Sequence, residues 1–114
     1  MQNNESAAQL ARGFEFSSAL LRHEIAYVLG QMQNETSFDG LNKVLSNNSE
    51  HPMVRHEAAE AIGALPSTNV EELLKNYLKD EEPLVSESCL VALDMADYFQ
   101  SDKLEYADAL KNQD

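Results

Sequence analysis

A six-residue pattern recurs along the chain at a spacing typical of stacked helical repeats. The segment LRHEIA at 21–26 returns as VRHEAA at 54–59, an offset of 33 residues. A weaker copy, VSESCL at 85–90, follows after another 31 residues. Periods of this size indicate helical hairpins stacked into a solenoid or a similar array. This repeat constrains the fold more than any other feature of the sequence.

The apolar residues of each copy follow the period of an α-helix. In every copy they fall at positions i, i+4, i+7, i+8 and i+11, which places them on one stripe of a helix. Three copies of one stripe predict three helices that bury equivalent faces. The stripes are Leu21, Ile25, Val28, Leu29 and Met32; Val54, Ala58, Ala61, Ile62 and Leu65; and Val85, Cys89, Ala92, Leu93 and Ala96.

Shorter apolar segments between the copies predict a partner helix for each of them, at 5–12, 37–46 and 69–79. The connections are short and polar, and Pro52 and Pro83 suit the first turn of a helix. The sequence has no alternating strand pattern and no candidate linker. The predicted fold class is all-α, a short α-solenoid of three HEAT-like helical hairpins.

The predicted domain covers residues 1–99, with repeats at about 5–33, 36–65 and 68–99. Residues 100–114 are rich in acidic side chains and are expected to form an acidic C-terminal tail.

The net charge of the 114-residue chain is −12, from 20 acidic and 8 basic residues. This balance disfavours nucleic-acid binding, which needs clustered Lys and Arg. The acidic charge suits a cationic ligand or a basic loop of a partner. The alternative is that the charge only keeps the domain soluble. The single cysteine, Cys89, indicates a reducing compartment, and no signal peptide or membrane span is expected. The expected location is the cytoplasm, with the nucleus as a further compartment.

Two His-Glu pairs, His23-Glu24 and His56-Glu57, occupy equivalent positions of the first two copies. On a helical wheel each histidine lies almost opposite the apolar stripe, with its glutamate on the flank. Neighbouring helices of a solenoid lie roughly 10 Å apart. Two imidazoles and two carboxylates are therefore expected on one surface. Such a set suits divalent iron or manganese, and two histidines with one carboxylate are typical of non-haem iron oxygenases.

Less specific interpretations of these residues stay open. The pairs could be a repeat consensus without function, although Glu87-Ser88 stands at the matching positions of the third copy, so the fold itself does not need the pair. A zinc-peptidase helix is excluded because neither histidine has a second histidine four residues later. Cys89 lies on an apolar stripe and is expected to be a buried small hydrophobe rather than a nucleophile. His51 precedes a proline and is expected to be an ordinary loop residue.

The two long motifs, SALLRHEIAYVLGQ at 18–31 and PMVRHEAAEAIGA at 52–64, resemble the iron-binding repeats of the deoxyhypusine hydroxylase family. ESCLVALDM at 87–95 is similar to the last repeat of that family, and LEYA at 104–107 to its C-terminal end. The resemblance runs from about residue 10 to residue 107.

This resemblance implies a di-iron monooxygenase that uses molecular oxygen to hydroxylate deoxyhypusine, a modified lysine of eukaryotic translation initiation factor five-A. The family has two similar halves, each with two His-Glu pairs, and this chain matches the C-terminal one. His23, Glu24, His56 and Glu57 would then be iron ligands. An iron held by two histidines of one half would take a glutamate from the other. Glu60 would either contact the cationic substrate side chain or remain solvated.

The chain departs from the family in lacking the N-terminal half, so only four of eight expected ligands are present. It is expected to be an excised domain, nearly inactive alone, that works with the missing half or with a second copy of itself. Two other functions compete with the enzymatic one. The first is a metal-free HEAT-like scaffold that binds a protein partner. The second, which no residue specifically supports, is a repeat protein of the chromophore-lyase type.

Overall fold

The structure is a computed structural model that describes residues 4–15, 18–67 and 69–111. Within these ranges it contains helices and no strand. The α-helices are α1 (Asn4–Arg12), α2 (Ala19–Met32), α3 (Phe38–Ser46), α4 (Pro52–Gly63), α5 (Val70–Lys75) and α6 (Pro83–Lys111), and two short 3-10 helices, η1 (Gly13–Glu15) and η2 (Glu35–Ser37), join the first three. The predicted all-α fold class is confirmed.

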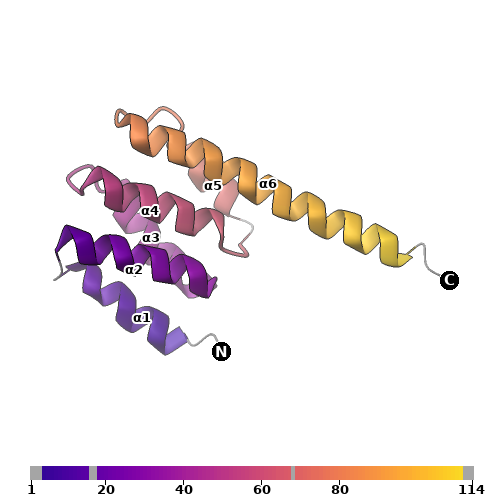
Figure 1. Ribbon diagram of the computed structural model, residues 1–114, viewed down its shortest axis with the longest axis horizontal. Coiled ribbons are helices and arrows are strands. Elements are labelled where there is room, and N and C mark those ends of the chain that lie inside the picture. The colour runs from indigo at the N-terminus through magenta and orange to yellow at the C-terminus, as the bar shows by residue number, and fades with distance from the viewer. Residues whose placement is uncertain (1–3, 16–17, 68, 112–114) are drawn as a thin grey trace.

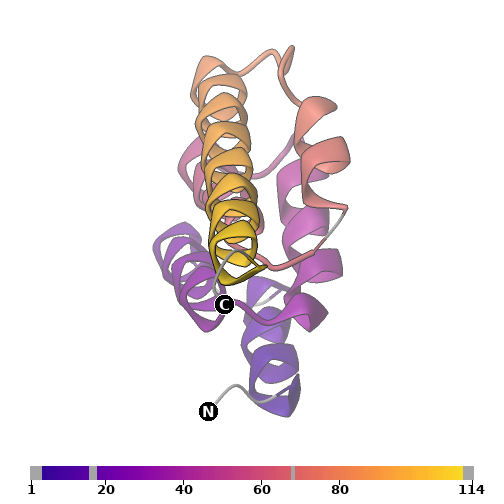
Figure 2. The ribbon, with the colours of Figure 1, turned by 90° about the vertical axis from the view of Figure 1, so that its right-hand side faces the viewer.

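The helices form three hairpins, α1–α2, α3–α4 and α5–α6, stacked side by side (Figure 1). Helices α2, α4 and α6 make one layer, and α1, α3 and α5 make the other (Figure 2). Within the first layer α2 packs on α4 and α4 packs on α6, which are the most extensive contacts between elements. Residues of the first layer that are far apart in sequence therefore meet across adjacent helices. No described helix is both long enough and apolar enough to cross a membrane.

Local signals explain where α2 and α4 begin. Ser18 is the N-cap of α2, and its side chain accepts a hydrogen bond from the backbone N–H of Leu21 at 3.3 Å. His51 is the N-cap of α4, and its Nδ1 accepts from the backbone N–H of Met53 at 3.1 Å. Each cap satisfies a backbone donor that the first helical turn leaves free. His51, predicted to be an ordinary loop residue, therefore has a structural role.

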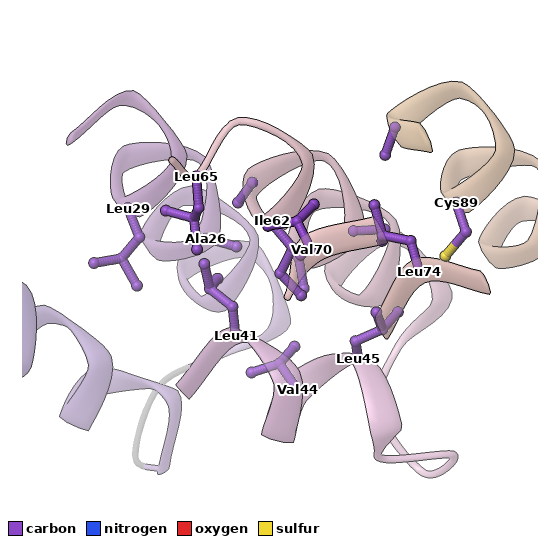
Figure 3. Close-up of a cluster of buried hydrophobic side chains, with 14 of the residues drawn as sticks. Ala26, Leu29, Leu41, Val44, Leu45, Ile62, Leu65, Val70, Leu74 and Cys89 are labelled. Atoms are coloured by element: carbon purple, nitrogen blue, oxygen red, sulfur yellow. The ribbon is translucent and has the colours of Figure 1, made fainter. Parts of the chain in front are cut away.

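The hydrophobic core lies between the two layers (Figure 3). Its largest fully buried side chains come from both layers, and each leucine among them contributes roughly 1.5–3 kcal/mol through burial. They include Leu29, Leu41, Leu45, Ile62 and Leu74. Cys89 is a free cysteine and is also fully buried, and its burial was predicted. Desolvation raises the pKa of its thiol to about 11, so it is a poor nucleophile at neutral pH.

The predicted apolar stripes are buried in the second repeat and almost completely in the third, where Leu93 is half-buried. The first stripe departs from the prediction, because Leu21 is 52% exposed and Val28 is 39% exposed. The equivalent residues of α4, Val54 and Ala61, are buried, and Ala61 lies against Gly30 of the preceding helix of their layer. Within the described chain no helix of that layer precedes α2, so this side of α2 stays open.

Two predicted segments differ in detail from the structure. The partner helix expected at 69–79 is α-helical only as far as Lys75 and continues as turns with i to i−3 hydrogen bonds. The segment expected to be an acidic tail, 100–114, is helical to Lys111 as the end of α6, and 112–114 lie outside the described residues. Thr68, at the predicted start of the third repeat, also lies outside them.

Candidate metal centre

Helices α2 and α4 carry the two candidate histidines at the same distance from their N-termini. His23 follows the N-cap Ser18 by five residues, and His56 follows the N-cap His51 by five. Because the helices are neighbours in one layer, equal spacing from equivalent caps brings the two imidazoles to the same level of the stack. The caps thus set the register of the candidate site.

Glycine–alanine contacts set the spacing between the helices of this layer. A Cβ added at Gly30 of α2 would lie 3.0 Å from both Cα and Cβ of Ala61 in α4. A Cβ added at Gly63 of α4 would lie only 2.8 Å from Cβ of Ala92 in α6. Neither position accommodates a larger side chain without moving a helix. Small residues therefore hold α2, α4 and α6 close enough for their polar side chains to meet.

Glu57 lies between the two histidines. Its Oε1 is 3.2 Å from Nε2 of His23 and 3.8 Å from Nε2 of His56. Glu60, one turn further along α4, has its Oε1 3.3 Å from the same Nε2 of His56. His56, Glu57 and Glu60 offer ligand atoms that all lie within 4.8 Å of one another. The Glu57 side chain is 12% exposed and that of Glu60 is 46% exposed, so the cluster reaches from the interior to the surface.

Glu24 stands apart from this cluster. Its Oε1 lies 3.7 Å from Nδ1 of His23, whereas Glu57 approaches Nε2 of the same ring. The Glu24 side chain is 60% exposed. The structure thus brings together His23, His56, Glu57 and Glu60, and it leaves Glu24 on the open side of α2. The predicted shared surface has two imidazoles and one of the two expected carboxylates at its centre.

The donor set fits a divalent transition metal. Two Nε2 atoms converge on one largely buried carboxylate, and a second carboxylate is within reach of His56. A set of imidazole and carboxylate ligands suits iron or manganese, whereas structural zinc sites are typically rich in thiolates. Nδ1 of His23 is buried and has no hydrogen-bond partner among the described residues. The residues that could hold an ion are therefore His23, His56, Glu57 and Glu60, with Glu24 at the edge.

A profile of the family described as HEAT repeats matches residues 8–94. The chain belongs to the HEAT-repeat family. This confirms the predicted HEAT-like character of the hairpins, and the match includes part or all of each of the three.

Curated relatives of this chain include deoxyhypusine hydroxylases. The chain is 58% identical over 86 residues to deoxyhypusine hydroxylase-B of Oryza sativa subsp. japonica, a match over 75% of this chain and 28% of that protein. It is 48% identical over 107 residues to the Mus musculus deoxyhypusine hydroxylase, over 94% of this chain and 35% of the other. The chain spans about a third of the length of these relatives.

A solved structure agrees with these sequence matches. Human deoxyhypusine hydroxylase in complex with glycerol superposes with a TM-score of 0.79 at 47% identity, over 82% of this chain and 33% of that one. The resemblance to deoxyhypusine hydroxylase predicted from the motifs is confirmed.

Arginine–carboxylate pairs link successive HEAT repeats beside the candidate site, and the sequence reasoning missed them. Arg22 donates from its guanidinium to both carboxylate oxygens of Glu50 at 2.7 Å. Arg55 donates to Asp80 at 2.6 and 3.1 Å and to the Leu45 carbonyl at 2.8 Å. The hydrogen bonds from the guanidinium groups hold the pKa values of the Glu50 and Asp80 carboxyls below their ordinary range.

The repeat itself contained a signal for these pairs. Arg22 and Arg55 each precede the histidine of their copy, and Ser86 replaces arginine in the third copy. Each acid lies in the loop that leads into the next helix of the layer, so each pair ties one repeat to the loop inside the following repeat. The arginines therefore stabilise the ends of α2 and α4 next to the candidate ligands.

Proposed function

We propose that this chain is the C-terminal half of a deoxyhypusine hydroxylase, a di-iron monooxygenase that hydroxylates the deoxyhypusine side chain of eukaryotic translation initiation factor five-A. The observation that carries the proposal is the convergence of His23 and His56 on Glu57, in a chain 43–58% identical to deoxyhypusine hydroxylases. The activity belongs to the two-half protein. Its proposed compartment is the cytoplasm, with the nucleus as a further compartment.

Each residue of the cluster has a proposed part. His23 and His56 hold iron through their Nε2 atoms, and Glu57 provides a carboxylate between them. Iron, when bound, supplies the oxygen chemistry that no amino-acid side chain performs, with molecular oxygen as co-substrate. The exposed carboxylate of Glu60 is placed to attract the additional amine of the substrate side chain. The net charge of −12 favours the approach of such a cationic group.

Glu24 is proposed to complete a site formed with a second half. It occupies the position in α2 that Glu57 occupies in α4. Glu57 is contacted by His23 of the preceding helix in the layer, α2. Leu21 and Val28 flank Glu24 on the same open side of α2. A helix that covered this side would bury both apolar residues and could bring a histidine toward Glu24. The proposed partner is the N-terminal half of the same enzyme, with a second copy of this chain as the alternative.

Metal analysis of the two-half protein tests the proposal. His23→Ala and His56→Ala should each lower the iron content measured by mass spectrometry and abolish substrate hydroxylation. Lys43→Ala is the control, because Lys43 is exposed on α3, in the other helix layer, and makes no described contact with the cluster. Unchanged iron content and unchanged hydroxylation in both site variants would rule the metal centre out.

A metal-free HEAT scaffold is the second candidate, and one observation favours it. The 3.2 Å contact between His23 and Glu57 and the 3.3 Å contact between His56 and Glu60 are compatible with ion pairs of protonated histidines. Such pairs would stabilise the stack without an ion. On this alternative, His23→Ala and His56→Ala would weaken binding of a protein partner in solution, and added Fe²⁺ or Mn²⁺ would not raise the thermal midpoint of the wild type.

A further inference from the structure

The third repeat contributes one side chain to the candidate centre, the hydroxyl of Ser88 on α6. Ser88 Oγ lies within hydrogen-bond distance of Nδ1 of His56, and the serine is only 5% exposed. Ser88 stands at the position in its repeat that Glu24 and Glu57 occupy in theirs. The third helix of the layer thus touches the histidine from the side opposite to the carboxylates.

The direction of this hydrogen bond follows from the other partner of Ser88. The hydroxyl donates to the backbone carbonyl of Leu84, one turn earlier in α6, at 2.5 Å. A carbonyl oxygen only accepts, and a serine has a single hydroxyl hydrogen, so that hydrogen lies between Ser88 and Leu84. The Oγ lone pairs are then the acceptor for His56. This arrangement requires a hydrogen on Nδ1 of His56.

We propose that Ser88 is a positioning residue that fixes His56 as the Nδ1–H tautomer and directs its Nε2 toward Glu57 and Glu60. In the neutral ring Nε2 then carries the lone pair, at 3.8 Å from the Glu57 oxygen and 3.3 Å from the Glu60 oxygen. Nε2 of His56 and the Oε1 atoms of Glu57 and Glu60 then form an electron-rich group suited to binding a cation. A hydrogen bond at the other ring nitrogen is the common means of orienting a metal-binding histidine. As a statement about metal affinity, the inference rests on the function proposed above.

His23 provides the contrast within the same centre. Its Nδ1 has no hydrogen-bond partner in the described part of the chain, and the nearest carboxylate oxygen, from Glu24, is 3.7 Å away. The chain therefore orients one of its two histidines by itself. His56 is prearranged by the third repeat, and this gives α6 a role in the centre although Glu87-Ser88 replaces the His-Glu pair there.

Three variants on α6 isolate the hydroxyl. Ser88→Ala removes it, Ser88→Thr keeps it, and Ser86→Ala is the matched control. Ser86 makes the same kind of bond to a backbone carbonyl, that of Pro83 at 3.1 Å, and has no described contact with a histidine. Circular dichroism establishes that each variant is folded.

The first readout is the protonation pattern of His56, measured by nitrogen-15 NMR on the metal-free chain. The wild type, Ser88→Thr and Ser86→Ala should show His56 with a hydrogen on Nδ1, and Ser88→Ala should shift it toward the Nε2–H form. The second readout is the Mn²⁺ affinity of the two-half protein by titration calorimetry, which should fall roughly 10–100-fold in Ser88→Ala alone. A His56 pattern unchanged in a folded Ser88→Ala variant would overturn the proposal.

These readouts separate the inference from the proposed function. If the NMR pattern changes as expected but no variant, the wild type included, binds Mn²⁺, the assignment of Ser88 stands and the metal centre is contradicted. If the wild type binds Mn²⁺ and Ser88→Ala binds it equally well with the same His56 pattern, the metal centre stands and the role of Ser88 is refuted.

Discussion

Nε2 of His23 lies 3.2 Å from Oε1 of Glu57, although the two residues belong to different repeats. The contact crosses from α2 to α4, and the same oxygen is 3.8 Å from Nε2 of His56. One carboxylate thereby serves the histidines of two repeats, so changes at Glu57 should affect both.

Glu57→Gln should lower Mn²⁺ affinity by more than tenfold, because a neutral amide between two imidazoles is a much poorer ligand for a divalent cation than a carboxylate. Titration calorimetry provides the measurement. Glu72→Gln is the control, since Glu72 is exposed on α5, in the other helix layer, and the substitution removes the same charge. Equal affinities for the two variants would show that Glu57 is not a ligand.

Gly63→Ala should destabilise the stack by about 1–3 kcal/mol, because its methyl group would meet Ala92 at 2.8 Å and force α6 away from α4. Gly40→Ala is the contrasting variant. Its Cβ would lie 3.4 Å from that of Ala11, an ordinary contact, so the gain in helix propensity of up to about 1 kcal/mol should make it neutral or stabilising. Urea unfolding measures both, and a Gly63→Ala variant as stable as Gly40→Ala would contradict the tight contact.

Asp80→Ala should cost roughly 3 kcal/mol in the free energy of unfolding, because it leaves the guanidinium of Arg55, only 4% exposed, without a carboxylate. Glu81→Ala removes the neighbouring, exposed acid and should change stability by less than about 0.5 kcal/mol. Chemical denaturation of the two variants at pH 7 decides the matter. A similar effect from both would indicate that the Arg55–Asp80 pair contributes nothing specific.

The same pair predicts a pH dependence. The Arg55 guanidinium holds the pKa of Asp80 below its ordinary value, so the folded carboxyl releases its proton more readily than the unfolded one. The resulting stabilisation is complete above the unfolded pKa, about 4, and is lost as the pH falls through the lower folded pKa. The stability gap between the wild type and Asp80→Ala should therefore be full at pH 7 and should narrow steadily below about pH 4. A gap that stays constant down to pH 2 would contradict this assignment.

Much of the fold was predictable because it rests on local periodicity. The apolar stripe of α4 (Val54, Ala58, Ala61, Ile62 and Leu65) is buried in the structure as predicted. The 33-residue offset predicted that His23 and His56 occupy equivalent positions, and equivalent N-caps maintain that register. These properties belong to single helices and to their repetition, which a sequence records directly.

Other features depended on how neighbouring helices meet. The helical wheel treated Glu24 and Glu57 alike, but only Glu57 faces a preceding helix of its layer and lies between the two rings. The same cause leaves Leu21 and Val28 exposed.

By itself, then, the sequence determined the number of repeats, the helices and the face on which the His-Glu pairs stand, because a 3.6-residue period orients side chains around one axis. The tertiary structure decided which carboxylate the histidines share, that Arg55 pairs with Asp80, and that Ser88 reaches His56. Those contacts depend on the distance and direction between separate helices, and in this chain the glycine–alanine contacts of the stack set that distance.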